Sequence, residues 1–453
     1  MYDLSKEFHD FYKNHVVLPN DKQNDLRSKK NLNIKRLKSG LKEYNTDNNT
    51  DYKISETRVQ GSMAMATVVQ NDSNDYDIDV AIVFEKDNIS DKGAIAIKNV
   101  IVDALKRKCT NFKSEPETKT NCVRIEYQDG YHVDFAIYRR YKEDGENEYT
   151  YEHAGSSWSL RNPSAINNWF SAEIKDKGDC LRKVIRFSKM FCKSRCFWIN
   201  MPGGLLQTVV WDEKIQNSYE RLDECFYYTM KEVKERLDAS IEVYNPTDTS
   251  TSLLLTQDHR TKMNNWLSRL SDKLEKLEIL FDTDCTFENA KDAWYEFFNH
   301  TYWQELSTVT ESSSAYELCS FRNTEEYIED MVNINEQYYV DVSCKVKANG
   351  FPLQSLVDFL SKFNKNWLPH GFSIDFDIVD TNVPEPYDVW WKVRNVGPVA
   401  EQKDNIRGQI EKKYHKHKHE ASQFYGEHYV ECYIIKNDEC VAISHIKVPI
   451  GQS

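Results

Sequence analysis

Three aspartates in two apolar segments are the residues of this sequence best suited to chemistry. Asp77 and Asp79 alternate with apolar residues in the run DYDIDV, and Asp134 lies within the run YHVDFAI. Residues two apart in a strand point to the same face, so Asp77 and Asp79 are predicted to project together. Adjacent carboxylates repel unless a cation lies between them, and carboxylate, phosphate and water oxygens are the ligands that Mg²⁺ prefers. The spacing therefore predicts a divalent metal site.

The third aspartate points to the reaction that such a site supports. An unpaired charge at Asp134 in an apolar strand is costly unless it also meets the metal. Three aspartates on neighbouring strands can hold two metals about 4 Å apart for in-line displacement at phosphorus. One ion would activate the attacking hydroxyl and the other would neutralise a triphosphate. We therefore expect two Mg²⁺ or Mn²⁺ ions, nucleoside triphosphate substrates, and catalytic and metal-binding roles for Asp77, Asp79 and Asp134.

A glycine and a serine between the predicted strands complete this pattern. Gly61 and Ser62 follow a predicted strand over 54–60 and precede a segment, 63–69, that we expect to be helical. Glycine lets a phosphate approach the backbone, and Ser62 can donate a hydrogen bond to it. A Gly-Ser pair or a D-x-D pair alone occurs by chance on many proteins. Their order along the chain, followed by a lone aspartate in a second apolar strand, is far more specific.

Hydrophobic periodicity predicts three regions that would position these residues. Two helices open the chain, and the β-rich block that follows has strands near 54–60, 76–84, 122–127 and 131–138, a helix near 93–108 and a turn at 128–130. Residues 163–299 are predicted to be helical, with 245–252 as a long loop, and alternating segments reappear after about residue 330. We expect an α+β fold with domains at 1–160 (catalytic lobe with N-terminal helices), 161–325 (helical lobe) and 330–453 (a separate α+β domain).

Composition excludes several classes of protein. The chain has 453 residues, a formal net charge of −13 and 40% hydrophobic residues, which is too rich in core-forming residues for a disordered protein. No apolar run approaches the roughly 20 residues of a membrane span, and no secretory signal opens the chain. The eleven cysteines contain no C-x-x-C pair and indicate free thiols. We expect a cytoplasmic protein without a membrane span.

The motif segments resemble a known family. VQGSMAMATVV, DYDIDVAIVF and YHVDFAIY, together with LSKEFHDFYKNHVVLP and LRKVIRFSKMFCK, resemble the cGAS/DncV-like nucleotidyltransferases (CD-NTases) of bacterial CBASS anti-phage defence. These enzymes belong to the polymerase-β superfamily. The resemblance implies a polymerase-β-like nucleotidyltransferase core, with a β-rich catalytic lobe and a helical lobe, over roughly residues 1–300.

The same resemblance implies nucleotide contacts. Lys189 would contact the donor triphosphate, and Gln60, Gly61 and Ser62 would contact the donor nucleotide. The family often carries a Pro-Ser-Gly-type segment after the lysine helix, whose serine touches the phosphates. Gly203 takes that place here, in Met-Pro-Gly-Gly, where its backbone N–H could substitute for the hydroxyl.

The C-terminal region carries a second resemblance. The runs YDVWWKVRNVGPVA and ASQFYGEHYVECYII resemble the sensor domain (AGS-C) that is fused to some of these enzymes. The resemblance implies a nucleotide- or ligand-sensing module. Aromatic and cationic side chains could stack on and neutralise such a ligand. The candidate contacts are Trp391, Lys392, Arg394 and Arg407, and core packing is the alternative for the tryptophan.

The function implied is synthesis of a cyclic di- or trinucleotide second messenger, with release of pyrophosphate, that acts on a downstream effector. One alternative is a template-independent synthase of linear oligonucleotides. A second alternative is a nucleotide-sensing switch that works through the C-terminal domain.

Two charged segments have simpler interpretations. The run YHKHKHE could suggest a transition-metal site, but on a helix its histidines do not share a face, so we favour a solvated surface. The basic residues between Arg27 and Lys42 could bind an activating nucleic acid. A solvated amphipathic helix is the favoured interpretation, given the acidic total.

Overall fold

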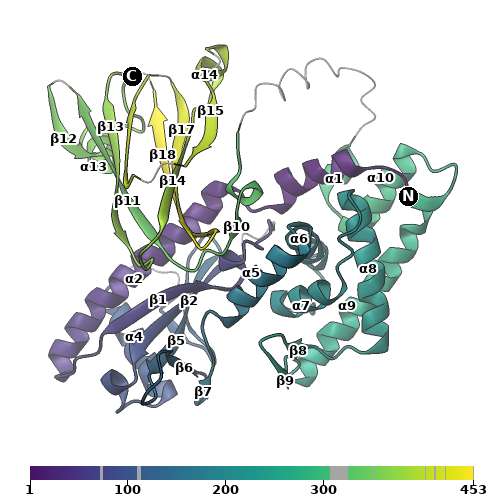
Figure 1. Ribbon diagram of the computed structural model, residues 1–453, viewed down its shortest axis with the longest axis horizontal. Helices are drawn as coiled ribbons and strands as arrows, with labels where there is room; N and C mark the ends of the chain where they lie inside the picture. Colours follow the sequence, from purple (N-terminus) through teal and green to yellow (C-terminus); the bar gives the residue numbers. More distant parts are fainter. Residues whose placement is uncertain are drawn as a thin grey trace. The chain divides into compact units, whose positions relative to one another are not determined.

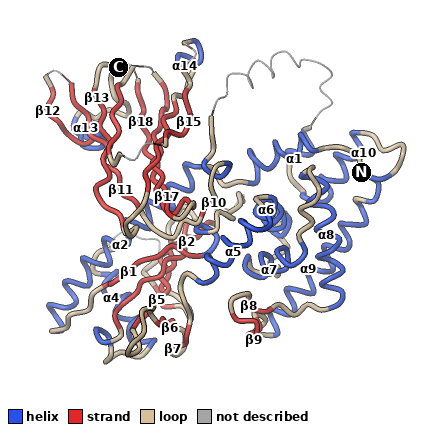
Figure 2. The backbone as a smooth tube through the Cα atoms, viewed as in Figure 1, coloured by secondary structure: helices blue, strands red, loops and turns tan. Residues whose placement is uncertain are grey.

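The computed structural model describes residues 1–71, 75–109, 114–306, 325–348, 350–403, 405–412, 415–423 and 425–451. The chain divides into two compact units, Met1–Glu56 with Gln60–Thr308, and Thr57–Val59 with Val309–Ser453. Figure 1 colours the elements along the chain, and Figure 2 separates the helix-rich and strand-rich parts. No helix among the described residues is long and apolar enough to cross a membrane.

A seven-stranded sheet supports the predicted metal site. Its strands follow the order β1-β2-β5-β4-β3, with β6 paired to β5 and β7 to β6. The strands are β1 (Ile54–Gln60), β2 (Tyr76–Glu85), β3 (Glu117–Thr118), β4 (Val123–Glu126), β5 (Tyr131–Tyr141), β6 (Thr150–Ala154) and β7 (Trp158–Leu160). β2 and β5 are parallel and central, which is why both are almost continuously apolar.

Two helices, α2 (Asn20–Asn48) and α4 (Ala94–Lys106), pack on each other and on this sheet. The crossing is close at Gly40, where a Cβ atom would collide with the backbone oxygen of Ala104. Ile78, Val80 and Ile82 of β2 are buried, as the alternation predicted. Alternation therefore leaves Asp77 and Asp79 on the opposite face of the sheet.

The helical part of the first unit surrounds an aromatic core. Phe8 of α1 (Ser5–Phe11) contacts Phe187, Phe226 and Trp294, with ring centroids 4.6–6.3 Å apart. The opening helix is therefore an integral part of this core. The remaining helices are α3 (Gly61–Ala64), α5 (Ala165–Lys177), α6 (Cys180–Lys193), α7 (Gly204–Lys214), α8 (Leu222–Ala239), α9 (Gln257–Lys276), α10 (Phe287–Phe298) and α11 (Thr301–Glu305).

Three details of this unit differ from the expectations. The predicted loop at 245–252 is instead a small hairpin of β8 (Tyr244–Asn245) and β9 (Asp248–Ser252). The helix after Gly61 covers only Gly61–Ala64 and does not continue to residue 69. Cys180 and Cys225 form a disulfide pair, so the expectation of free thiols is wrong for these two cysteines. Cys319 lies outside the described residues.

The second unit is β-rich and contains two sheets. One has the order β10-β18-β17-β14-β15 and the other β12-β11-β13-β16. Val430 and Ile434 of the first sheet and Ile374 and Phe376 of the second belong to one core cluster. Its elements are β10 (Asn333–Ile334), β11 (Val340–Ala348), β12 (Phe351–Ser355), α13 (Leu356–Lys362), β13 (Ser373–Thr381), β14 (Asp388–Arg394), α14 (Pro398–Gln402), β15 (Arg407–Glu411), β16 (His417–Ala421), β17 (Gly426–Lys436) and β18 (Glu439–Ile450).

The hairpin between β17 and β18 turns at Lys436-Asn437-Asp438. Asn437 and Asp438 have φ values of 51° and 60°, and left-handed conformations at both turn positions are typical of a tight hairpin turn. The histidine run, which we had considered on a helix, forms β16, an edge strand of the second sheet. This correction changes which histidines share a face.

Candidate active site

The sheet register brings the three predicted aspartates together. Asp79 of β2 is the direct neighbour of Asp134 on β5, and Asp77 is the neighbour of His132. Strands in a sheet are about 4.8 Å apart, so three carboxylates share a small area of one face. All three line a cavity of about 690 Å³, whose other lining residues include Gln60, Gly61, Ser62, Lys189 and Gly203. The eight predicted residues of the nucleotidyltransferase site thus surround one cavity.

The turn after β1 presses against one of these carboxylates. Gly61 has a φ of 65°, a conformation that favours glycine, and begins α3 directly after the strand. A Cβ atom at this position would collide with Oδ2 of Asp79. The glycine is therefore required both by its backbone conformation and by the close approach of Asp79.

Burial and mutual repulsion act on Asp79. Its carboxyl pKa is raised to about 8, first by burial and then by the negative charges of Asp77 and Asp134, against the opposing effect of Arg124 and Arg161. A carboxyl group in this position stays protonated at neutral pH unless a cation joins it. The oxygen-rich donor set and this repulsion fit a hard divalent cation, with Asp77, Asp79 and Asp134 as the residues that could hold it.

Asp134 already has a cationic partner. Arg124 Nε and Nη2 donate to its two carboxylate oxygens at 2.9 and 2.7 Å. This bidentate pair fixes the orientation of the carboxylate. Arg124 was not among the predicted site residues, although the predicted hairpin contained the signal. A symmetric pairing around Asp129 places residue 124 opposite residue 134, as observed.

The buried lysine faces the same cavity. Lys189 on α6 is only 8% exposed, and its Nζ atom donates to the backbone oxygen and the hydroxyl of Thr67 at 3.2 and 2.7 Å. Burial lowers its pKa to about 7, while the charge of Asp77 acts in the opposite direction. Gly204 leaves room for the lysine, because a Cβ atom there would lie 3.1 Å from Lys189 Cε. No sequence pattern indicated Thr67 as a partner.

Gln60 and Gly203 line the cavity in different ways. The side-chain amide of Gln60 donates to the backbone oxygen of Pro163 at 2.5 Å and to the hydroxyl of Tyr138 at 3.3 Å. Gly203 precedes α7 as its N-cap residue, and a Cβ atom there would have no neighbour within 4 Å. Its backbone therefore lies at an open helix N-terminus, where N–H groups favour anions.

The four candidate ligand contacts of the C-terminal unit lie in a different setting. Trp391 is 1% exposed, packs in the core and donates its indole N–H to the backbone oxygen of His415 at 2.9 Å. Arg407 binds both carboxylate oxygens of Glu420, at 2.6 and 3.0 Å. It also lines a cavity of about 100 Å³, which Trp391, Lys392 and Arg394 do not line. Among the described residues, Arg407 alone of the four borders this cavity.

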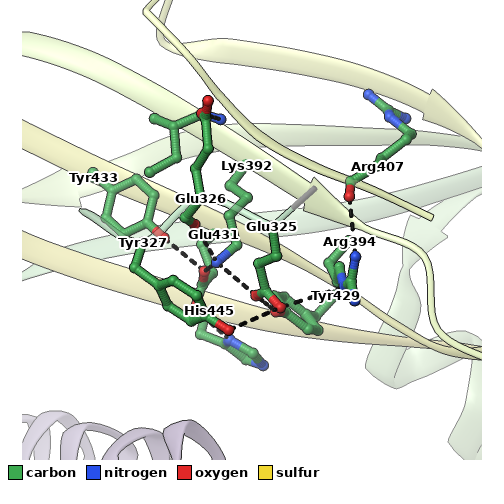
Figure 3. Close-up of polar contacts among 11 residues, drawn as sticks. Glu325, Glu326, Tyr327, Lys392, Arg394, Arg407, Tyr429, Glu431, Tyr433 and His445 are labelled. Carbon is green, nitrogen blue, oxygen red and sulfur yellow. Dashed lines mark hydrogen bonds and ion pairs between the residues drawn. The ribbon is translucent and has the colours of Figure 1, made fainter. Parts of the chain in front are cut away.

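Lys392 lies at the centre of a buried ionic network (Figure 3). Its Nζ atom lies 2.8 Å from Glu431 Oε2 and 3.0 Å from Glu325 Oε1. Tyr433 donates to Glu431 at 2.6 Å, and His445 Nδ1 lies 3.1 Å from the other oxygen of that carboxylate. Burial alone would lower the pKa of Lys392, but the two glutamates raise it above its ordinary value. This lysine is neutralised by the protein itself.

The predicted basic surface of α2 is only partly exposed. Arg27 and Lys30 are buried, and Lys29 pairs with Asp129 at 2.8 Å. Lys35 and Lys38 remain exposed, as does Lys42. The observed surface agrees better with an amphipathic helix that packs on the sheet than with a continuous basic face.

Family models match both units of the chain. Residues 55–138 match the nucleotidyltransferase domain of cyclic GMP-AMP synthase of the DncV type. Residues 322–451 match the adenylyl/guanylyl and SMODS C-terminal sensor domain. A cyclic GMP-AMP synthase from Escherichia albertii is 23% identical over 408 residues, which cover 86% of this chain and 83% of the relative.

Solved structures share the fold. Vibrio cholerae DncV, a cyclic AMP-GMP synthase crystallised with the linear intermediate pppA(3′,5′)pG, has a TM-score of 0.51 and 16% identity, covering 65% of this chain and 96% of that one. Escherichia coli CdnC with ATP has a TM-score of 0.50 and 15% identity, covering 66% and 98%. These matches support an enzyme with a DncV-like nucleotidyltransferase domain and a C-terminal sensor domain.

Proposed function

We propose that this enzyme joins nucleoside triphosphates into a cyclic di- or trinucleotide messenger and releases pyrophosphate. The observation that carries the proposal is the convergence of Asp77, Asp79, Asp134 and Lys189 on one cavity that is also bordered by Gly61 and Ser62. Its volume of about 690 Å³ lies within the usual range of small-molecule sites. The E. albertii relative, named a cyclic GMP-AMP synthase, supports a cyclic product.

The three aspartates are proposed to bind two Mg²⁺ or Mn²⁺ ions. When bound, these ions supply activation of the attacking hydroxyl and neutralisation of the triphosphate. Asp77 and Asp79 project from the same face of β2, which suits carboxylates that share both ions. Asp134, held by Arg124, is proposed to orient the attacking hydroxyl and to accept its proton at a carboxylate oxygen.

The donor nucleotide is proposed to contact the other five residues. Lys189 would leave Thr67 and pair with the triphosphate, which would restore its charged form in the buried site. Ser62 and the backbone at Gly61 would contact phosphate oxygens, and the N–H of Gly203 would do so from the start of α7. Gln60, whose amide nitrogen is bound to Pro163, would use its carbonyl oxygen.

The wider setting is also a proposal. We assign the three domains to 1–160, 161–325 and 330–453, and we place the enzyme in the cytoplasm, within CBASS anti-phage defence. The product would activate a separate effector. In the C-terminal domain, Trp391, Lys392, Arg394 and Arg407 stay proposed ligand contacts, which would require the ion pairs of Lys392 and Arg407 to open. An activating nucleic acid is not favoured.

The test is nucleotide turnover by the purified chain with Mg²⁺ or Mn²⁺ and four labelled ribonucleotides. We expect release of pyrophosphate and a product that resists phosphatase. The double substitution Asp77→Asn/Asp79→Asn should remove this release, because neutral amides cannot hold two dications. Asp129→Asn, in the exposed hairpin turn, is the control and should keep wild-type turnover.

The same experiment separates the alternative product. A ladder with phosphatase-sensitive ends would favour a synthase of linear oligonucleotides. Retained turnover in the double variant would contradict the assignment of the metal ligands.

A further inference from the structure

Two strands of the C-terminal unit present alternating histidines and carboxylates on one face. His417 and His419 lie two residues apart on β16, and Asp375 and Asp377 lie two apart on the adjacent β13. The register pairs Asp375 with His419 and Asp377 with His417. Because side chains alternate along strands, all four point to the same side of the sheet. The helical interpretation of this run had separated the histidines, and the strand brings them together.

The ligand atoms of three of these residues already lie close enough to share one ion. A carboxylate oxygen of Asp375 and ring nitrogens of His417 and His419 all lie within 4.8 Å of one another. His419 Nδ1 is hydrogen-bonded to Asp375 Oδ1 at 2.6 Å, and His417 Nε2 lies 3.7 Å from the same oxygen, so a metal ion would take the place of the proton between His419 and Asp375. Neighbouring ligand atoms of a tetrahedral zinc site are about 3.3 Å apart, given metal–ligand bonds of roughly 2.0–2.1 Å. The two observed distances lie on either side of that spacing.

Asp377 fixes the orientation of one histidine. Its Oδ1 atom lies 2.8 Å from His417 Nδ1, and since a carboxylate only accepts, Nδ1 is the nitrogen that donates to Asp377 and Nε2 is the nitrogen on the side of Asp375. Metal-binding histidines commonly donate their other N–H to a carboxylate in this way. Lys345 Nζ lies 3.6 Å from the second oxygen of Asp377 and balances its charge.

The lysines of the run do not oppose a cation here. Lys418 points to the opposite face of the sheet from the histidines. It pairs with Glu411 at 2.8 Å and with Glu420 at 3.2 Å. Lys416 pairs with Glu385 at 2.9 Å. Their charges are compensated by other carboxylates, so neither lysine pairs with Asp375 or Asp377, and Lys345 is the lysine that contacts Asp377.

We propose that Asp375, His417 and His419 form a binding site for a transition-metal dication of the Zn²⁺ class, with Asp377 as an orienting residue. Two imidazole nitrogens and one carboxylate oxygen are a donor set that suits zinc and its first-row neighbours better than Mg²⁺. The histidines are about half exposed, with side-chain exposures of 53% and 57%, so the fourth ligand position opens to solvent. Three protein ligands with an open position are typical of zinc sites that keep a water molecule.

The test is titration of the full chain with Co²⁺ in excess Mg²⁺, in the Asp77→Asn/Asp79→Asn background that removes the proposed catalytic metal ligands. Binding at the proposed site should give visible d–d absorption, without the thiolate charge-transfer band that cobalt bound to cysteine would show. Zn²⁺ should displace the cobalt. His417→Ala and His419→Ala should each weaken cobalt binding at least 10-fold, and Asp377→Asn by about 10- to 100-fold.

The matched control is His415→Ala, which changes a histidine of the same run outside β16 and keeps the backbone oxygen that binds Trp391. It should bind cobalt as the background protein does. Circular dichroism of each variant checks that the fold is kept. Absence of stoichiometric d–d absorption, or equal absorption in His417→Ala, His419→Ala and His415→Ala, would overturn the proposal. Because the background lacks the catalytic aspartates, this outcome is independent of the proposed synthase activity.

Discussion

Two buried lysines of this chain have opposite environments. Lys189, in the nucleotidyltransferase cavity, is bound to the uncharged oxygens of Thr67, and no carboxylate lies within 4 Å of its Nζ atom among the residues described. Lys392, in the C-terminal unit, lies between Glu325 and Glu431. Burial lowers the pKa of the first lysine to about 7, whereas the glutamates raise the pKa of the second against the effect of burial.

Lys189 therefore lies in a site that lacks an anion, whereas Lys392 lies in a network that already contains its anions. A buried ammonium without a negative partner is unfavourable until one is supplied, and a triphosphate would supply it. A buried ammonium between two carboxylates is stable as it is, and its removal takes away the cation that lies between them. Burial of a lysine therefore does not by itself indicate a binding site, and the charge of its partners decides.

The first prediction applies to the closed network and has the largest expected effect. Lys392→Met should lower the free energy of unfolding of the C-terminal unit by about 3–5 kcal/mol, because Glu325 and Glu431 would lose the buried ammonium that lies between them and keep only Arg394 and His445 as cationic partners. Denaturant titration of the full chain, with deuterium labelling of peptides from β14 and β17, measures this loss. The loss of stability should be the same with and without added nucleotides.

Lys412→Met is the matched control. Lys412 is exposed, and its Nζ atom lies 4.7 Å from the ring centre of Trp390, so its loss removes only an exposed cation–π contact. Equal stability of the Lys392→Met and wild-type proteins would contradict the claim that Lys392 stabilises the buried network.

The second prediction applies to the open cavity. Lys189→Met should reduce turnover about 100- to 1,000-fold, as expected when one charge-stabilising group is lost from the transition state. The free energy of unfolding should stay equal or increase, because the substitution removes a buried charge that has no anionic partner. Pyrophosphate release and thermal unfolding of the same preparation measure the two effects.

Lys193→Met, one helical turn further along α6, is the control for this variant. Lys193 also borders the cavity but is exposed, so turnover should change much less. Strong destabilisation by Lys189→Met would show that this lysine is structural, and the contrast with Lys392 would then be wrong.

Local sequence patterns were sufficient to predict the strands and the aspartates of the nucleotidyltransferase cavity. Alternation in DYDIDV and YHVDFAI fixed two strands and the face of Asp77 and Asp79, because central parallel strands are apolar wherever a site does not interrupt them. The turn at Gln128-Asp129-Gly130 was also correct. The role of Lys189 came from a family resemblance, since no local pattern connects it with Thr67, which is 122 positions away.

The ionic network around Lys392 depends on contacts between segments that are distant in the sequence. Glu325 lies 67 positions before Lys392 and Glu431 lies 39 after it, so no periodicity could reveal the ionic network. The histidine run was assigned to a helix for a related reason. Its alternating charges contain no apolar residue that would distinguish a period of 2 from 3.6, and charged edge strands are common because they prevent pairing with other sheets.

The last prediction uses pH to probe the closed network. Glu431 is buried, which alone would raise its pKa, but His445 and Lys392 lower it to about 2, below the ordinary value of 4.5. A carboxyl whose pKa is lowered by folding stabilises the folded state above its unfolded pKa. This contribution should disappear as the pH falls from about 5 toward 2, because protonation then favours the unfolded chain. The titratable groups that face Glu431 include Lys392 and His445, together with Tyr429 and Tyr433 of the same strand.

Equilibration at each pH in denaturant, followed by a short deuterium pulse at one fixed pH, measures the stability of the C-terminal unit. Glu431→Gln should flatten the decline between pH 5 and 2, since the amide does not titrate, although the variant is less stable at neutral pH. Glu427→Gln, at the exposed start of β17, should keep the wild-type slope. If all three proteins show the same slope, the stabilisation of Lys392 comes from Glu325, and the network depends on one glutamate rather than two.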